Sequence, residues 1–283
     1  MITYKTCTDV SLKQIFEAFR LGFSDYIIPV TINEIDFNTH FWGPEGNQLD
    51  YSYIAFDDIH PVGLILSGIR IFDGIKTMRC GTLCLSPEYR GKGISQVLFE
   101  MHKKAAINAG CKQLFLEVLR ENHRAIKFYK KQGYLEATIL KYYSATVTSI
   151  PSLMEAPPYK LTTLTYDNIK GFRDKLRACH INWQSDTPYY EHTTNDVFLG
   201  MYDEDQLLAM IAVNSKGKIN FLWVDPAYRS KGLAHYLVLA ALQQLKVEKM
   251  TVCIPSNALL EGFFRKLQFQ KDKIEQYEMY LPL

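Results

Sequence analysis

The sequence has almost no net charge and no long apolar run. Its 32 basic and 30 acidic side chains leave a formal net charge of +2 over 283 residues. At the level of the whole chain, nothing therefore favours a nucleic acid or an anionic membrane as a partner. The longest apolar runs, such as residues 62–66, are far shorter than the ~20 residues that span a bilayer. We expect neither nucleic-acid binding nor membrane insertion.

The sequence also lacks paired cysteines and metal-binding spacings. Its six cysteines are scattered and form no Cys-x-x-Cys pair, and no His-x-x-x-His or Cys/His cluster is present. In a chain of this length such scattered cysteines are typical of reduced, mostly buried thiols. The first residues lack the apolar core and the cleavage site of a signal peptide. These features predict a cytoplasmic protein without a metal.

What is present is a globular composition. Hydrophobic residues make up 47% of the chain and charged residues 22%, which is typical of folded rather than disordered proteins. At this length about two domains of ordinary size are expected.

Residues 86–95 join a strand-like run to an amphipathic helix. After them, apolar residues recur every three or four positions, which places them on one helical face; these are Ile94, Val97, Leu98, Met101 and Ala105. A glycine-containing turn that opens a helix leaves backbone N–H groups unpaired beside the positive end of the helix dipole. Such a turn binds phosphate.

The spacing within this turn separates three phosphate-binding motifs. A dinucleotide fingerprint needs a glycine where Gln96 stands, and no window matches the nucleotide P-loop. The remaining pattern, Arg/Gln-x-x-Gly-x-Gly/Ala, is read from Arg90 to Ser95, with Ser95 where Gly or Ala is usual. It resembles the acetyl-CoA pyrophosphate loop of the GNAT superfamily of N-acetyltransferases. The resemblance implies acetyl-CoA as co-substrate, bound by Leu83, Cys84, Leu85, Arg90, Gly91, Lys92, Gly93, Ile94, Ser95, Gln96 and Asn122.

The expected order of elements matches the GNAT succession. Periodicity and turn residues predict β-α-α-β-β-β-α-β-α-β over the first half of the chain. The expected segments are strands 2–7, 51–56, 62–71, 76–85, 112–119 and 134–143, and helices 11–22, 31–41, 94–109 and 122–133.

The second half repeats the first. Pro87, Tyr89, Arg90, Lys92 and Gly93 recur 139 positions later as Pro226, Tyr228, Arg229, Lys231 and Gly232. A repeat of this length indicates a duplicated domain rather than a solenoid. The expected second-half elements are a helix at 166–179 and strands at 197–202, 207–213 and 219–224. We predict an α/β (α+β) protein of two tandem GNAT domains, at 1–149 and 159–283, joined by a proline-rich linker at 150–158. Each should be a mixed, mostly antiparallel twisted sheet flanked by helices.

Residues 116–137 resemble the corresponding segment of bacterial ribosomal-protein N-terminal alanine acetyltransferases. The resemblance implies that Glu117 is the general base and Tyr129 the general acid. Independently of it, a carboxylate on a strand that is apolar on both faces is costly unless it is partnered or functional. The alternatives are a structural carboxylate at Glu117, a core aromatic at Tyr129, and a simple helix cap at Asn122.

In the second half the loop persists but the acid and base do not. Phe264 stands where Tyr129 is, and Val252 falls at the position of Glu117. Neither side chain can exchange a proton. A second cofactor site remains a candidate, and a purely structural role is favoured for this half. The candidate second cofactor site would consist of Trp223, Val224, Arg229, Ser230, Lys231, Gly232, Leu233 and Ala234.

By resemblance, the acceptor substrate should lie beside Asp25, Tyr26, Tyr51 and Tyr53, with Asp25 available to pair with an amine; an ordinary aromatic surface is the alternative. The expected function is transfer of an acetyl group from acetyl-CoA to a primary amine of a small molecule by direct attack. Acetylation of a peptide N-terminus, and a non-catalytic acyl-CoA-binding or scaffold protein, are the alternatives. The sequence leaves open whether the chain forms a homodimer.

Overall fold

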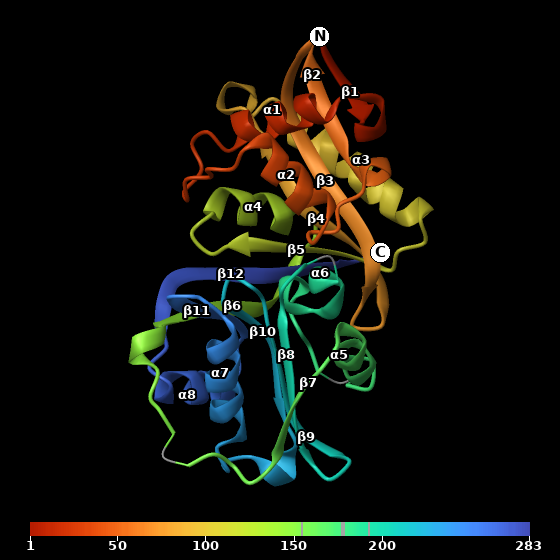
Figure 1. Cartoon of the computed structure of the whole chain (residues 1–283). Coiled ribbons are helices and arrows are strands. Elements are labelled where there is room, and N and C mark those ends of the chain that lie inside the picture. Colours follow the sequence, from red (N-terminus) through yellow and green to blue (C-terminus); the bar gives the residue numbers. More distant parts are fainter. Residues whose placement is uncertain (154, 177–178, 192) are drawn as a thin grey trace. The chain divides into compact units, whose positions relative to one another are not determined.

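The computed structural model describes residues 1–153, 155–176, 179–191 and 193–283. The chain forms two compact units (Figure 1). Unit 1 comprises Met1–Ala137 together with Tyr277–Leu283, and unit 2 comprises Thr138–Gln276. The last residues of the chain are therefore part of the unit that begins it. These units are defined by contacts within the folded chain. The domain boundary at residue 149 was inferred from the sequence and stays a prediction.

Unit 1 is built on one mixed sheet. Neighbouring strands from β1 to β4 pair antiparallel, while β4 and β5 pair parallel. The strands follow one another as β1 (Ile2–Thr6), β2 (Tyr53–Asp57), β3 (His60–Phe72), β4 (Ile75–Leu85), β5 (Gln113–Leu119) and the end of β12 (Gln270–Pro282).

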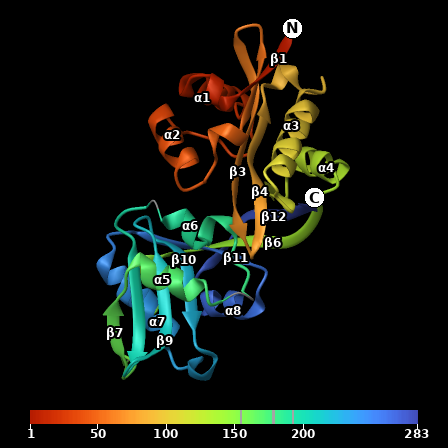
Figure 2. The same ribbon diagram turned by 90° about the vertical axis from the view of Figure 1, so that its right-hand side faces the viewer.

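Helices cover both faces of this sheet (Figure 2). One face carries α1 (Leu12–Gly22) and α2 (Glu34–Trp42), and the other carries α3 (Ile94–Asn108) and α4 (His123–Lys131). A side-chain cap begins α1, α2 and α4; Ser11, for example, forms a capping box with Gln14 at the start of α1.

The parallel pair in unit 1 is short. β4 and β5 pair only from Thr77–Arg79 to Gln113–Phe115, and the rest of β4 keeps its pairing with β3 on its other edge. We call the point where β4 and β5 stop pairing the fork of unit 1. Beyond it, backbone groups on the β5-facing edge of β4 are left for another partner.

Unit 2 repeats this plan in smaller form. Its strands follow one another as the start of β12, then β6 (Leu135–Thr146), β11 (Lys249–Pro255), β10 (Lys218–Val224), β9 (Gln206–Val213), β8 (Val197–Asp203) and β7 (Lys160–Thr163). The helices α7 (Leu233–Gln244) and α8 (Ala258–Lys266) pack on one face, and α5 (Tyr166–Arg173) and α6 (Thr187–Tyr190) lie toward the other. The parallel pair β10–β11 again forks, after Ile219 and Val252.

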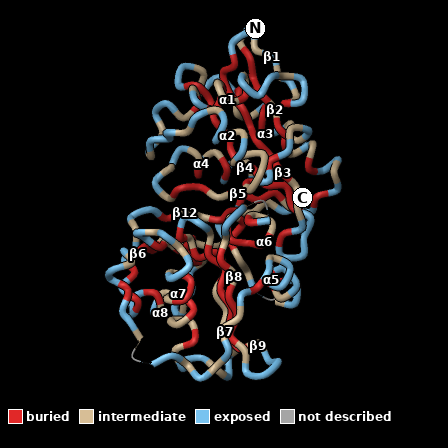
Figure 3. The backbone as a smooth tube through the Cα atoms, in the orientation of Figure 1, coloured by how far each residue is buried: buried red, intermediate tan, exposed pale blue. Residues whose placement is uncertain are grey.

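The structure confirms the predicted fold class, a mixed α/β architecture with mostly antiparallel sheets flanked by helices. Buried residues concentrate on the strands and on the inner helix faces (Figure 3). The predicted helix at 166–179 is shorter: α5 ends at Arg173, and residues 177 and 178 lie outside the described part of the chain. In the described residues, no helix combines the length and the apolar character needed to cross a membrane.

Candidate active site

The turn after β4 has the backbone of an anion site. A short 3-10 turn, Pro87–Tyr89, leads to Gly91 and Gly93, whose φ angles of 75° and 81° are left-handed. Side chains other than glycine are strained there, so the two glycines are needed for the turn itself. Gly93 is the N-cap of α3, and the first amides of a helix have no intrahelical partner. The turn therefore presents backbone N–H groups at the positive end of α3.

Arg90 does not face this anion site. Its Nη1 and Nη2 lie 2.5 and 2.6 Å from the two carboxylate oxygens of Asp25, and its Nε donates to the backbone oxygen of Leu85 at 3.2 Å. Arg90 thus ties the segment after α1 to the end of β4. Asp25, expected beside the acceptor amine, has its carboxylate ion-paired in this way, so an amine would have to displace Arg90. Lys92 adds a positive charge within the turn, and its Nζ lies 4.8 Å from the centre of the Tyr89 ring.

Glu117 lies on β5 with its side chain only 3% exposed. Its Oε2 accepts a hydrogen bond from Arg79 Nη2 at 2.7 Å. Its Oε1 is buried and has no hydrogen-bond partner among the described residues. A buried carboxylate oxygen without a partner is unusual in a folded protein, and here it leaves one acceptor available to a bound molecule.

Arg79 gathers carboxylates around it. Arg79 stands on β4 and, besides Glu117, donates to Glu45 of the segment before β2. The charge of Glu278 on β12 also acts on Glu117. We call Glu45, Arg79, Glu117 and Glu278 the Arg79 cluster. All four side chains are buried. A buried charge of this kind is tolerated only when it is paired, so the single guanidinium explains how the carboxylates can be there.

Glu45 and Glu117 of the Arg79 cluster have pKa values shifted in opposite directions. Burial opposes ionisation of Glu45, yet the charge of Arg79 and the hydrogen bond from His40 hold its pKa below the ordinary value. Burial, with the repulsion of Glu278 and Glu45, raises the pKa of Glu117, and the pull of Arg79 only partly offsets this. Glu45 therefore serves as the permanent counter-ion of Arg79. Glu117 therefore holds a proton more readily than Glu45 does.

Sequence reasoning missed Arg79, Glu45 and Glu278. A signal existed for two of them, because Arg79 and Glu278 are charged residues inside otherwise apolar strand runs, where a charge needs a partner. Glu45 carried no such signal, since it lies in a glycine-rich turn that reads as an ordinary loop.

Tyr129 lies on α4, on the other face of the sheet from the Arg79 cluster. Burial, followed by the nearby Cys80 thiol and Tyr134, raises its pKa well above the ordinary value. The side chain of Asn122 caps α4 by accepting from the Ala125 amide at 3.2 Å. Burial also raises the pKa of Tyr26, against a hydrogen bond with Asn122. Tyr26, Asn122 and Tyr129 are thus brought to one side of the fork.

The remaining predicted site residues divide into two groups. Leu83, Cys84 and Leu85 pair with β3 on one edge and lie beyond the last β4–β5 pair on the other, as a main-chain contact to a ligand requires. Tyr51 and Tyr53 lie before and on β2, which β3 and β4 separate from β5. The structure does not bring these two tyrosines to Glu117.

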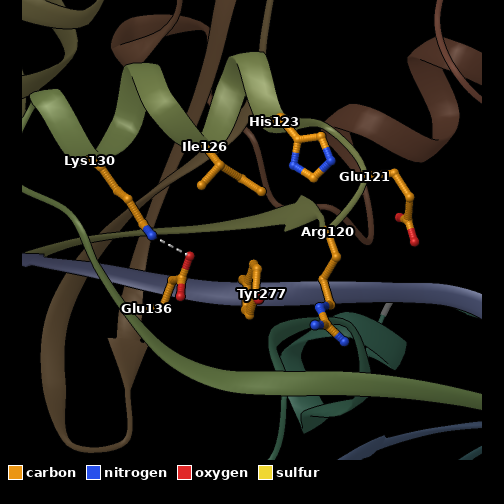
Figure 4. A pocket seen from close by; sticks show the side chains of 7 residues that line it. All are labelled: Arg120, Glu121, His123, Ile126, Lys130, Glu136 and Tyr277. Atoms are coloured by element: carbon orange, nitrogen blue, oxygen red, sulfur yellow. Dashed lines mark ion pairs between the residues drawn. The ribbon is translucent and has the colours of Figure 1, made fainter.

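A separate cavity of about 470 Å³ lies on the α4 side of unit 1 (Figure 4). It is bounded by an ion pair between Lys130 and Glu136 at 2.8 Å and by Arg120 over the ring of Tyr277. Neither Glu117 nor Tyr129 lines it. Its size alone therefore does not make it the reactive site.

The turn in unit 2 has nearly the same backbone. Gly232, the N-cap of α7, has a φ of 82°, and Ser230 adopts a φ of 63° where Gly91 stands in unit 1. Arg229 Nε donates to the backbone oxygen of Val224 at 3.3 Å, and Lys231 Nζ lies 4.5 Å from the Tyr228 ring centre. The positions of the predicted acid and base differ. Phe264 stands at that of Tyr129, and the strand pairing places Cys253 rather than Val252 at that of Glu117; both side chains are buried.

Comparison with known families decides the relationship. Residues 13–134 match the acetyltransferase (GNAT) family, and residues 165–283 match an acetyltransferase (GNAT) domain. The chain belongs to the GNAT acetyltransferases. It carries one GNAT domain in each half, which confirms the tandem arrangement predicted from the repeated loop.

Two curated relatives match part of this GNAT chain. A thialysine N-epsilon-acetyltransferase of Bos taurus is 41% identical over 54 residues, which are 19% of this chain and 32% of the relative. An N-alpha-acetyltransferase 30 of Schizosaccharomyces pombe is 27% identical over 97 residues, 33% of this chain and 64% of the relative. The chain therefore covers less than two thirds of either relative.

Solved structures of GNAT proteins share the fold. A tandem GNAT protein from the clavulanic acid biosynthesis pathway has a TM-score of 0.73 at 15% identity, covering 100% of this chain and 98% of that one. A GNAT protein from Sphaerobacter thermophilus has a TM-score of 0.71 at 11% identity, covering 100% and 95%. At these identities the likeness concerns the fold. In the described residues, no group of three or more His, Cys, Asp or Glu side chains is placed to hold a metal ion.

Proposed function

We propose that unit 1 transfers an acetyl group from acetyl-CoA to a primary amine of a small molecule by direct attack. The observation that carries this proposal is Glu117, a buried carboxylate with one unpartnered oxygen beside the fork. The GNAT match over residues 13–134 supplies the acyl-transfer context. The free thiols of the chain, five of them buried, support a reducing, cytoplasmic setting for the reaction.

Binding of acetyl-CoA would use main-chain groups. The pyrophosphate would accept hydrogen bonds from the amides of residues 91–95 at the start of α3, with Lys92 adding charge. The pantetheine arm would lie along the edge of β4 at residues 83–85, where pairing with β5 has ended. Because these contacts are to the backbone, the apolar side chains there can remain in the core.

Glu117 would remove the proton that makes the amine an ammonium ion. A base works best when its pKa lies near the working pH, and burial with the repulsion of Glu278 and Glu45 raises the pKa of Glu117 in that direction. The freed amine attacks the thioester carbonyl, the C–N bond forms, and the C–S bond breaks. The products are the acetamide, the thiol form of CoA and one proton.

Tyr129 would stabilise the departing thiolate. Its raised pKa keeps the phenol protonated, and that pKa lies above the ~8.5 of an ordinary thiol. A complete proton transfer from Tyr129 to the thiolate is therefore uphill. We assign Tyr129 a hydrogen bond to the thiolate sulfur as the C–S bond breaks, which lowers the barrier without a stable tyrosinate.

A peptide N-terminus is the second candidate acceptor. The match to an N-alpha-acetyltransferase favours it, whereas the match to a thialysine N-epsilon-acetyltransferase favours a free amine. Both acceptors present a primary amine, so the same base and the same thiolate donor would serve either.

The test measures thiol release from acetyl-CoA with polyamines, aminoglycosides, amino acids, and peptides that start with Ala or Ser. We expect turnover on one amine class, and a kcat roughly 10²–10⁴-fold lower in Glu117→Gln, because general-base catalysis contributes about that much. The matched control is Glu136→Gln, which removes a partly exposed carboxylate of the same unit and should retain full activity.

Binding of acetyl-CoA without acetylation of any amine would contradict the enzyme proposal. It would favour the non-catalytic acyl-CoA-binding alternative. Equal losses of kcat in Glu117→Gln and Glu136→Gln would contradict the assignment of Glu117 as the base. They would not contradict the proposed acetyltransferase activity.

A further inference from the structure

Unit 2 contains a cavity of about 110 Å³ that the proposed reaction does not use. It lies at the fork of unit 2, between residues 219–223 of β10 and 252–255 of β11, with α8 on one side and described residues of the segment 176–185 on the other. Most of its walls are apolar. Polar side chains interrupt them, among them Asn182, Ser185 and Asn220 beside His180.

Asn182, Ser185 and Asn220 are buried, and each has one polar atom without a hydrogen-bond partner. Their exposures are 1%, 2% and 7%. The unpartnered atoms are Nδ2 of Asn182, Oγ of Ser185 and Oδ1 of Asn220, counted over the part of the chain that the structure describes. Buried polar atoms in folded proteins are nearly always hydrogen-bonded. One water needs only about 10–15 Å³ of such space, so this cavity has room for a larger polar guest.

Asn220 reaches the cavity because of a β-bulge. The register between β9 and β10 shifts between Ile219 and Phe221, which leaves Asn220 as the extra residue. Bulges redirect side chains and are frequent next to binding sites. The corresponding bulge in unit 1 leaves Gly81, which is 139 positions earlier, and Asn47 from a loop occupies the space beside that glycine. Unit 1 thus fills with its own loop a position from which unit 2 extends an amide side chain.

The cavity coincides with the reactive position of the other unit. Cys253 and Phe264 line it. Phe264 corresponds to Tyr129 by its place in the repeat, and Cys253 corresponds to Glu117, because Lys218 pairs with Thr251 as Arg79 pairs with Phe115. The turn at residues 229–234, which follows β10, repeats the left-handed backbone of residues 90–95. A molecule with phosphate groups at that turn and an arm in the fork would place its far end in this cavity.

We propose that unit 2 binds a coenzyme A thioester whose acyl group carries a hydroxyl, and retains it without transferring it. A single hydroxyl can pair with all three orphaned atoms. It has one hydrogen to donate to Asn220 Oδ1 and two lone pairs to accept from Asn182 Nδ2 and the Ser185 hydroxyl. Acetyl has no hydrogen-bonding group beyond its carbonyl. Phe264 cannot donate a proton to a departing thiolate, and Cys253 stands where Glu117 stands in unit 1, so this unit lacks both the phenol and the carboxylate proposed to act on the thioester in unit 1.

The test is calorimetric titration of the full chain with 3-hydroxybutyryl-CoA and with butyryl-CoA. These probes differ by the hydroxyl alone. Ser95→Glu places a carboxylate in the turn of unit 1, so that the titration reports unit 2. We expect one equivalent of 3-hydroxybutyryl-CoA to bind about tenfold or more tightly than butyryl-CoA, because the unsubstituted chain leaves buried polar atoms unpaired. Asn220→Leu should remove this preference.

The matched control is Ala234→Glu, which places the same charge at the equivalent position of the second turn and, combined with Ser95→Glu, should abolish binding. Equal affinities for the two esters would overturn the hydroxyl assignment. Failure of Ser95→Glu to bind either ester would overturn the site as a whole, and would leave the cavity as a hydrated space. Ser185→Ala replaces Asn220→Leu if circular dichroism shows that the latter does not fold. None of these binding results depends on whether unit 1 acetylates an amine.

Discussion

The two units share a phosphate turn and differ in what lies beside the fork. Gly93 and Gly232 have φ angles of 81° and 82°, and Arg90 and Arg229 each donate from Nε to the backbone oxygen of the last residue of the preceding strand. The glycine and the arginine therefore build the turn in both units, whether or not the proposed pair of Glu117 and Tyr129 is nearby. A GNAT turn indicates binding of a phosphate-bearing molecule, and reactivity has to be argued from other residues.

The difference extends to the basic residue on the strand before the turn. Arg79 in unit 1 is held by two carboxylates, whereas Lys218, at the same place in unit 2, donates from Nζ to the Gln184 backbone oxygen at 2.7 Å. In unit 1, the acids around this position have pKa values shifted in opposite directions, down for Glu45 and up for Glu117. Pairs of groups whose pKa values are pushed apart mark acid and base roles.

Among the comparisons of the two units, the largest change in kcat should come from removing the phenol that would donate a hydrogen bond to the thiolate. Tyr129→Phe gives unit 1 the residue that unit 2 has as Phe264. We expect kcat to fall roughly 10–100-fold with unchanged affinity for acetyl-CoA, since one hydrogen bond to developing charge is lost. Stopped assays of thiol release and titration with acetyl-CoA measure the two quantities.

The matched control for that change is Phe264→Tyr, which should leave turnover unaffected because unit 2 has no carboxylate at the position of Glu117, where Cys253 stands. An unchanged kcat in Tyr129→Phe would contradict the role assigned to the phenol and leave it as a core aromatic.

A smaller effect should appear in the pH profile of unit 1. Glu117 acts when deprotonated, and Glu278 raises its pKa while Arg79 lowers it. Glu278→Gln should therefore move the rising limb of kcat/KM to lower pH, and Arg79→Gln should move it to higher pH. A shift of one pH unit changes the rate about tenfold below the limb.

The matched variant for this profile is Lys218→Gln in unit 2, which should leave the limb where it is. Shifts of the same sign in Glu278→Gln and Arg79→Gln would contradict the electrostatic account. If Arg79→Gln does not fold because Glu45 and Glu117 lose their partner, the direction found for Glu278→Gln decides the question alone.

The smallest effect compares the two turns directly. Gly93→Ala and Gly232→Ala each force a side chain into the left-handed region, which costs about 1–2 kcal/mol. Urea unfolding should show similar losses of stability in both variants. Only Gly93→Ala should also raise the KM for acetyl-CoA, and a raised KM in Gly232→Ala would show that unit 2 takes part in turnover.

The local elements were predictable from the sequence, since the helix caps, the glycine turn and the apolar periodicity all act over a few residues. The positions of β4, α3, β5 and α4 follow from these signals to within a few residues. The repeat of the turn was also enough to predict the second GNAT domain, because duplication preserves spacing.

What could not be predicted depends on contacts between distant segments. The pairing of Asp25 with Arg90 and of Glu45 with Arg79 requires knowing which loops lie over which strand. The same limit hid Glu278, whose strand is remote in sequence from β5. Tyr51 and Tyr53 were placed at the site by resemblance, and the order of the strands separates them from it.

The return of β12 to unit 1 has a consequence for synthesis of the protein. Residues 277–283 complete the sheet next to β5 and carry Glu278, yet the ribosome makes them only after all of unit 2. At typical elongation rates the roughly 140 residues of unit 2 take about ten to thirty seconds to emerge. During that interval unit 1 exposes the edge of β5 and lacks one acid of the Arg79 cluster. Newly made chains should therefore gain activity only after the last strand has left the ribosome.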